Sequence, residues 1–280
     1  MRSIKSAIFA LMVAGATAMG LDSSLEQNNP SDWTIQKGDG AVSSGGDNSV
    51  CYKSGADSDV ELQSEKSLKI DPQKTYRLSG SFHQTAESAA TTLYFGVAPL
   101  DEEGKAINSN QVNVVEGTET ELAANCQPAD TVVTIKNGTK WEISPEGATY
   151  ECIAFDVDDS GKFTDLPNSN LSKLGIVEVT KAGDGFEVTL AKPCGVTYPA
   201  GTKVRKHLAS SNGIYAAASG KKLSQEWTEL SGNIEPGPLF GNPKDKWWKG
   251  TKRAKIVIIV RGASDAIPQF EFKDIRLDEE

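Results

Sequence analysis

The segment TYRLSGSFHQ, residues 75–84, decides the fold class because its apolar and polar residues alternate. Tyr76, Leu78 and Phe82 would share one face of an extended strand. Arg77 and His83 would share the opposite face, which meets water or a ligand. The segment therefore predicts a half-buried strand of an antiparallel sheet.

Many other segments of the chain have the same alternation or a run of β-branched residues. They lie near residues 60–64, 91–100, 131–136, 150–157, 176–180, 186–190, 202–208, 213–218, 228–234, 254–261 and 269–277. About a dozen strands, with no comparably long helical period, predict an all-β fold, a jelly-roll β-sandwich of antiparallel strands with long loops. We expect one sandwich domain over residues 49–280. Residues 19–48 are rich in Gly, Ser and Asn and are expected to be loosely structured.

The last expected strand changes its parity partway along. Phe270 and Phe272 would point to one face, whereas Ile275 and Leu277 have the opposite parity. A β-bulge near Lys273 would return all four side chains to the same face.

The charge balance excludes several classes of protein. The net charge is −9 and 38 % of residues are apolar. Nucleic-acid binders need an excess of Lys and Arg, so no nucleic-acid partner is expected. The apolar content is too high for a disordered chain.

The N-terminus has the pattern of a secretory signal peptide over residues 1–18. Arg2 and Lys5 precede a short apolar run over residues 7–14, and the small residues of positions 16–18 fit a cleavage site. The run is too short to span a bilayer, which needs about 20 apolar residues. We therefore expect a secreted protein without membrane insertion, located extracellularly, or in the periplasm or at the cell surface of a bacterium.

If the chain is exported, its four cysteines enter an oxidising compartment. They are Cys51, Cys126, Cys152 and Cys194. An even number without C-x-x-C spacing favours two disulfides in an oxidising compartment, with three pairings open. A zinc site or a catalytic thiol is the less favoured alternative.

Several stretches resemble jelly-roll carbohydrate-binding modules with a galactose-binding-like fold. They are IDPQKTYRLSGSF at 70–82, YFGVAPLDEEGK at 94–105 and FKDIRL at 272–277. Two further stretches, FDVDDSGKFTDLPN at 155–168 and YPAGTKVRKH at 198–207, resemble jelly-roll domains of secreted surface and adhesin-type proteins. The resemblance implies sugar binding, often with a structural calcium ion.

Two places offer oxygen ligands for such a calcium ion. Asp156, Asp158 and Ser160 reproduce the first half of an EF-hand loop, although Pro167 stands where its last ligand would be. Asp274 is the other candidate because its strand parity turns it inward. The alternative for the first place is an acidic loop in solvent.

Aromatic residues could form the sugar platform, because the C–H faces of sugars stack on aromatic rings. Trp247 and Trp248 are the favoured pair, since neighbours on an extended chain point in opposite directions and one should be exposed. Trp141 is a further candidate. Core packing is the alternative for each ring.

A second set of candidate ligand contacts follows near residues 205–215. Arg205 and His207 would share a strand face, and Tyr215 lies on the next expected strand. An arginine fork and an aromatic ring suit an acidic or hydroxyl-rich sugar. An ordinary polar strand face is the alternative.

These features predict a secreted, non-catalytic, lectin-like module that binds a glycan. A polysaccharide lyase or glycoside hydrolase on the same scaffold is one alternative, and a cleft with His83 facing a tyrosine and an arginine would favour it. No nucleophile elbow or metalloprotease motif occurs, and no catalytic residue is assigned. A structural or adhesive protein that binds another protein is the other alternative, marked by a large exposed apolar patch.

Overall fold

The computed structural model describes residues 23–55, 59–85, 91–143, 150–237, 245–262 and 267–280. These residues are almost entirely strand and loop, with one 3-10 turn, η1 (Pro30–Asp32), and one short helix, α1 (Ser109–Val112). Within them, no helix has the length and apolar composition needed to cross a bilayer. The expected signal peptide lies outside the described residues.

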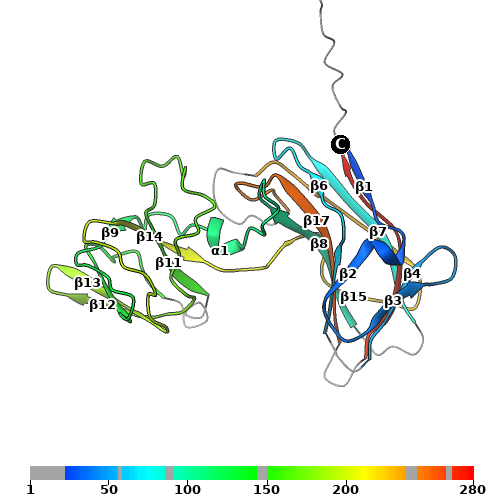
Figure 1. Cartoon of the computed structure of the whole chain (residues 1–280), viewed down its shortest axis with the longest axis horizontal. Helices are drawn as coiled ribbons and strands as arrows, with labels where there is room; N and C mark the ends of the chain where they lie inside the picture. The colour runs from blue at the N-terminus through cyan, green and yellow to red at the C-terminus, as the bar shows by residue number, and fades with distance from the viewer. Residues whose placement is uncertain (1–22, 56–58, 86–90, 144–149, 238–244, 263–266) are drawn as a thin grey trace, which may run out of the picture.

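Two antiparallel sheets form a β-sandwich at one side of the molecule (Figure 1). The first, called the β7 sheet, has the order β16 (Thr228–Ile234), β7 (Tyr76–Gln84), β18 (Gln269–Glu279), β4 (Val50–Lys53) and β3 (Ala41–Ser44), with β1 (Ser24–Glu26) also paired to β18. The second, called the β8 sheet, has the order β15 (Ile214–Lys222), β8 (Thr91–Leu100), β17 (Arg253–Gly262), β5 (Asp59–Ser64) and β2 (Trp33–Lys37), with β6 (Leu68–Lys69) also paired to β17. The all-β sandwich expected from the alternating segments is thus confirmed.

The inward faces of the two sheets form the sandwich core. Tyr76, Leu78 and Phe82 of β7 are buried, as the alternation predicts. The ring of Phe82 packs edge-on against Phe95 of the facing sheet, with ring centroids 4.8 Å apart. Each buried aromatic ring of this kind removes a large apolar area from water, so the alternating strands stabilise each other across the core.

The expected bulge in the last strand is present. The pairing of β18 with β7 shifts between Lys273 and Arg276, and Asp274 has a positive φ of 55°. Phe272 before the bulge and Ile275 after it are both fully buried. The bulge therefore keeps the whole strand facing the core.

The N-terminal segment differs from the expectation of a loose structure over residues 19–48. Strands β1 and β3 add to the β7 sheet and β2 adds to the β8 sheet. Trp33 of β2 enters the core and packs edge-on against Phe272 at 5.0 Å. Of the described residues, Gly38, Gly40 and Asn48 lie in turns between these short strands, whereas Ser43 and Ser44 lie within β3, so composition alone hides the strand signal.

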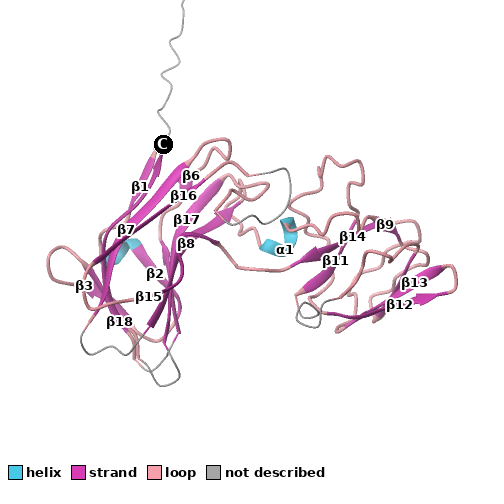
Figure 2. Cartoon of the chain, turned by 180° about the vertical axis from the view of Figure 1, so that it is seen from behind, coloured by secondary structure: helices cyan, strands magenta, loops and turns pink. Residues whose placement is uncertain are grey.

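The chain between β8 and β15 leaves the sandwich and forms what we call the inserted lobe, residues 101–210 (Figure 2). It contains α1 and two small antiparallel sheets. One has the order β10 (Val132–Ile135), β13 (Gly185–Leu190) and β12 (Ile176–Ala182), and the other β11 (Glu151–Phe155), β14 (Lys203–Leu208) and β9 (Thr120–Glu121).

The inserted lobe has its own hydrophobic core, separate from that of the sandwich. Trp141, Ile153 and Phe155 belong to it, and the ring of Phe155 stacks on Tyr198 at 3.9 Å. The expectation of a single sandwich over residues 49–280 is corrected accordingly. Strand periodicity marks which face of a strand is buried, but it does not say against which core.

Candidate functional site

The structure places both tryptophans of the favoured pair in the sandwich interior. Trp247 and Trp248 are each 1 % exposed. The Trp247 ring packs edge-on against Tyr76 at 5.4 Å, and its Nε1 donates to the backbone oxygen of Lys74. The chain turns directly after the pair, since the amide of Thr251 donates to the Trp248 oxygen. The argument from an extended chain therefore does not apply, and the predicted tryptophan platform is corrected to core packing.

Trp141 is also a core residue rather than a ligand contact. It is 1 % exposed in the inserted lobe, and its Nε1 donates to the backbone oxygen of Thr118 at 2.8 Å. A buried indole with its N–H satisfied is the usual structural role of tryptophan.

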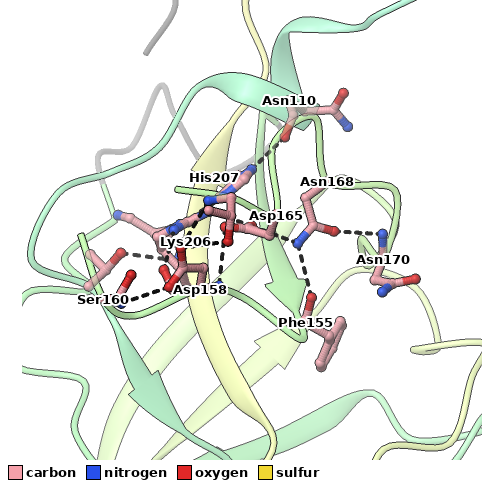
Figure 3. Close-up of polar contacts among 12 residues, drawn as sticks. Asn110, Phe155, Asp158, Ser160, Asp165, Asn168, Asn170, Lys206 and His207 are labelled. Carbon is pink, nitrogen blue, oxygen red and sulfur yellow. Dashed lines mark hydrogen bonds and ion pairs between the residues drawn. The ribbon is translucent and has the colours of Figure 1, made fainter. Parts of the chain in front are cut away.

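Arg205 and His207 do share one face of β14, as predicted, but the loop that contains Asp158 and Asp165 packs on that face. Figure 3 shows His207 beside this loop and beside Asn110. Both residues are 0 % exposed. Arg205 Nη2 donates to Asp165 Oδ2 at 2.8 Å, and Arg205 Nε lies 3.1 Å from His207 Nε2. His207 Nδ1 lies 2.7 Å from the backbone oxygen of Asn110. The pair therefore holds the inserted lobe together and has no surface to offer a ligand.

These contacts assign one tautomer to His207. The Arg205 Nε–H is a donor, so His207 Nε2 accepts and His207 Nδ1–H donates to Asn110. Burial lowers the pKa of His207 to about 4, and the adjacent Arg205 charge acts in the same direction. The imidazole is neutral at pH 7.

We expect acid to destabilise the inserted lobe through His207. Its folded pKa of about 4 lies below the ordinary value of 6.5. The unfolded chain therefore binds more protons between these values, and the free energy of unfolding falls as the pH drops from about 6.5 to 4, by up to about 3 kcal/mol. Denaturant unfolding at pH 7 and pH 4.5 measures this loss. The variant His207→Gln should lose less stability over the same interval, and equal losses in both proteins would contradict the assignment.

The calcium candidates are not brought together. Asp274 lies on β18 of the sandwich, whereas Asp156, Asp158 and Ser160 lie in the inserted lobe. The prediction that Asp274 points inward is wrong, because the bulge leaves its side chain exposed and buries Ile275 instead. Asp158 Oδ1 accepts from the Ser160 amide at 2.9 Å, and Oδ2 accepts from the amide and hydroxyl of Thr164 at 2.9 and 2.7 Å. Hydrogen bonds from Ser160 and Thr164 lower the pKa of Asp158 below its usual value.

Both oxygens of Asp158 are thus used by its own loop, and Asp156 accepts from Asn170 Nδ2. Over the described parts of the chain, no three His, Cys, Asp or Glu side chains gather as metal ligands. We therefore assign no calcium ion to this loop, and calcium binding by this chain stays a prediction.

A polar hollow of about 330 Å³ lies beside this loop in the inserted lobe. Its charged lining is entirely acidic, with Glu116, Glu119, Asp158 and Asp159 around Phe163. Lys203 bridges Asp159 at 2.8 Å next to it. The hollow has one aromatic ring, and that ring packs against the buried Arg205 guanidinium.

A larger hollow of about 420 Å³ lies on the outer face of the β8 sheet, and we call it the sheet groove. Five strands contribute to it, and the connection over residues 210–212 that returns from the inserted lobe closes one side. Its lining includes Lys37, Asp59, Glu61, Tyr94, Ser210, Ser211, Asn212, Tyr215, Ser219, Ile259 and Arg261. Of the ligand contacts predicted from the sequence, the groove contains Tyr215.

Strand register explains why these side chains meet. Tyr94 is directly opposite Ile259, and Ile259 is directly opposite Glu61. The residues flanking them in sequence, such as Leu93 and Phe95, point into the core and are 0 % exposed. Ser219 pairs with Tyr94 and Lys37 pairs with Glu61, so one outward row crosses all five strands. At about 4.8 Å between strands, this row spans about 19 Å, enough for a short oligosaccharide.

Two tyrosine rings form the aromatic part of the groove. Tyr94 and Tyr215 meet edge to face with ring centroids 5.6 Å apart. The Arg261 guanidinium carbon lies 5.2 Å from the Tyr94 ring centroid. Burial raises the pKa of Tyr215 to about 12, with the Glu61 charge adding to the effect, so its hydroxyl is a neutral donor at pH 7.

The charges of the groove balance. Lys37 Nζ forms a salt bridge with Asp59 Oδ2 at 2.9 Å, and both side chains are partly exposed. Glu61 and Arg261 supply one further charge of each sign. Such a surface offers hydrogen-bond donors and acceptors without a net field for an anion.

Gly96 makes room for Tyr215 on the neighbouring strand. A Cβ at this position would lie 2.2 Å from the Ile214 oxygen and 2.7 Å from Tyr215 Cδ1. We expect Gly96→Ala to push β15 away from β8 and to lower the free energy of unfolding by about 1–3 kcal/mol. Thermal unfolding measures this effect. Gly46→Ala is the control because no atom lies within 4 Å of its added Cβ, and a similar loss in both variants would contradict the close approach.

His83 does not have the surroundings of a lyase base. It lies on the outer face of the β7 sheet, where its Nε2 is 3.6 Å from Glu271 Oε2. Its ring packs against Trp227 with centroids 4.2 Å apart, and the Lys273 ammonium lies 4.4 Å from the centroid of the same Trp227 ring. Within the described parts of the chain, the side chains that contact His83 are thus an acid and a tryptophan rather than a tyrosine and an arginine.

Comparisons with known proteins find only distant structural similarity. No protein-family model and no curated protein matches the sequence. Among solved structures, the CBM22-1 xylan-binding domain from Paenibacillus barcinonensis Xyn10C is similar over 91 % of this chain and 92 % of its own, with 9 % identity and a TM-score of 0.36. The Emp47p carbohydrate recognition domain is similar over 92 % and 95 %, with 9 % identity and a TM-score of 0.37.

An enzyme is also among the similar structures. The arabinose-bound MgGH51 α-L-arabinofuranosidase matches over 93 % of this chain but 27 % of its own, with 12 % identity and a TM-score of 0.35. Several of the similar structures are carbohydrate-binding modules. At such low identities and TM-scores, the similar structures carry no inference about the ligand of this chain. The ligand is inferred from the sheet groove instead.

Most of the residues that line the sheet groove were not predicted from the sequence. Tyr94, Glu61 and Arg261 each follow or precede a core residue on a strand that was correctly predicted. Their outward parity could be read from the alternation. What the sequence lacks is the strand order that sets Tyr94, Ile259 and Glu61 in one row.

Proposed function

We propose that the chain binds a glycan in the sheet groove and does not cleave it. The observation that carries the proposal is the pair of tyrosine rings, Tyr94 and Tyr215, beside a row of polar side chains on a rigid sheet. Aromatic faces stack on sugar C–H groups, and precisely placed polar groups fix the orientation of the ligand. A site built on strands holds these groups in place at little entropic cost on binding.

The balanced charges favour a neutral sugar over a uronic or sialic acid. Each cation of the groove has a carboxylate among its neighbours, with Lys37 bonded directly to Asp59. An anionic ligand would therefore gain little from Arg261 and would meet Glu61. Hydroxyl groups can instead donate to the carboxylates and accept from the cations.

A glycan array tests the proposal directly. We expect saturable binding of a neutral glycan, unchanged by a chelator, with no shortened product in solution. Release of oligosaccharide would show a hydrolase or a lyase instead. A blank array from a folded sample would contradict glycan binding and favour a protein-binding role.

A further inference from the structure

Two segments of the inserted lobe lie side by side as a short antiparallel ribbon. The amide of Cys126 donates to the Tyr198 oxygen at 2.8 Å, and the amide of Tyr198 donates back to the Cys126 oxygen at 2.9 Å. Farther along, the amide of Cys194 donates to the Asp130 oxygen at 2.8 Å. These bonds fix the backbones of residues 126–130 and 194–198 against each other.

The ribbon brings two cysteine side chains into contact inside the lobe core. Cys126 is 2 % exposed and Cys194 is 5 % exposed, both belong to the core cluster of the lobe, and the Cys194 thiol is close enough to act on the pKa of Cys126. All four cysteines are free thiols in the structure. Cys126 and Cys194 are far apart in sequence, so a bond between them would close a long loop.

The other two cysteines have no such neighbour. Cys51 lies on β4 of the sandwich beside Glu271, whereas Cys152 lies on β11 of the inserted lobe and contacts Asn110. One lies in the sandwich and the other in the inserted lobe, and neither has a cysteine as a neighbour, so no second bond forms between them within the chain. The expectation of two disulfides is therefore corrected to one pair in contact.

We propose that Cys126 and Cys194 are joined by a disulfide when the chain folds in an oxidising compartment, while Cys51 and Cys152 stay thiols. A small disulfide such as glutathione disulfide is the oxidant. One protein thiolate attacks a glutathione sulfur and releases one glutathione thiol. The other protein thiolate then attacks the mixed disulfide and releases the second, so the two electrons and two protons of the protein thiols end on glutathione.

Because both thiols are buried in the folded chain, the disulfide forms during folding rather than after it. Burial and the contact with Cys194 raise the pKa of Cys126 to about 12, so the folded thiol rarely ionises at pH 7. A reagent also cannot reach side chains this deeply buried. The inference is independent of glycan binding, because it rests only on the core of the inserted lobe.

Refolding tests the proposal with the whole chain. The reduced, denatured chain is refolded in a mixture of reduced and oxidised glutathione, then denatured and alkylated with iodoacetamide. We expect alkylation at Cys51 and Cys152 and a linked peptide pair containing Cys126 and Cys194. Alkylation of all four cysteines, or a linked pair that includes Cys51 or Cys152, would overturn the proposal.

Variants provide a second readout. A reducing agent should lower the melting temperature of the oxidised wild type by about 5–15 °C, because it releases the cross-linked loop. Cys51→Ser should show the same shift, since its side chain lies in the sandwich. Cys194→Ala should show none, and an unchanged shift in that variant would contradict the pairing.

Discussion

Replacing Tyr94 with alanine is expected to weaken glycan binding at least about tenfold, equivalent to about 1.4 kcal/mol. The change removes the ring that Tyr215 and Arg261 both contact, next to Ile259 at the middle of the outward row. Tyr94 lies on the outer face of β8, so the sandwich core is left intact. Titration of the glycan selected on the array into both proteins measures the loss.

Two variants show whether the effect comes from the ring in the groove. Tyr94→Phe keeps the ring and should keep most of the affinity. Tyr150 is an exposed tyrosine, 53 % accessible, in the inserted lobe, and Tyr150→Ala should bind as the wild type does. Equal losses in Tyr94→Ala and Tyr150→Ala would remove the basis for a groove-specific site.

Asp165→Ala is expected to lower the free energy of unfolding by a large amount. Asp165 is the ion partner of Arg205, which is fully buried, and removal of one partner leaves an uncompensated charge in the core. Breaking a buried pair in this way costs about 3–5 kcal/mol. Asp165 also accepts from the Asp158 amide and from Asn168 Nδ2, so its loop should become susceptible to protease. Denaturant unfolding and limited proteolysis measure the two effects.

Asp159→Ala is the matched control for that variant. Asp159 pairs with Lys203 at the same distance of 2.8 Å, but its side chain is 49 % exposed. Exposed pairs contribute about 0–1 kcal/mol, so the control should unfold almost as the wild type does. If both variants lost the same stability, the buried pair would not be the anchor of the loop.

The outline of the fold could be predicted from the sequence because strand alternation is local. In the segments around Tyr76, Tyr94 and Phe272, the sequence pattern itself shows which face of the strand is buried. The bulge at Asp274 follows from the change in parity of the apolar residues along the last strand. The division into two cores could not be predicted in this way. An alternating strand such as β13 looks the same whether it packs in the sandwich or in the inserted lobe.

The candidate site was harder to predict because exposure depends on tertiary contacts. Trp247 and Arg205 have the chemistry of ligand contacts, yet the core and a covering loop bury them. Tyr94 carried no local signal beyond its outward parity. Only the register between β8, β17 and β5 places it beside Glu61.

A crystal structure of the chain with its glycan would test the central claim most directly. The account predicts sugar density in the sheet groove, with rings against Tyr94 and Tyr215 and hydroxyls within hydrogen-bond distance of Glu61 or Arg261. Sugar bound elsewhere, such as in the acidic hollow at Glu119 and Asp159, with the groove free of ligand, would contradict it.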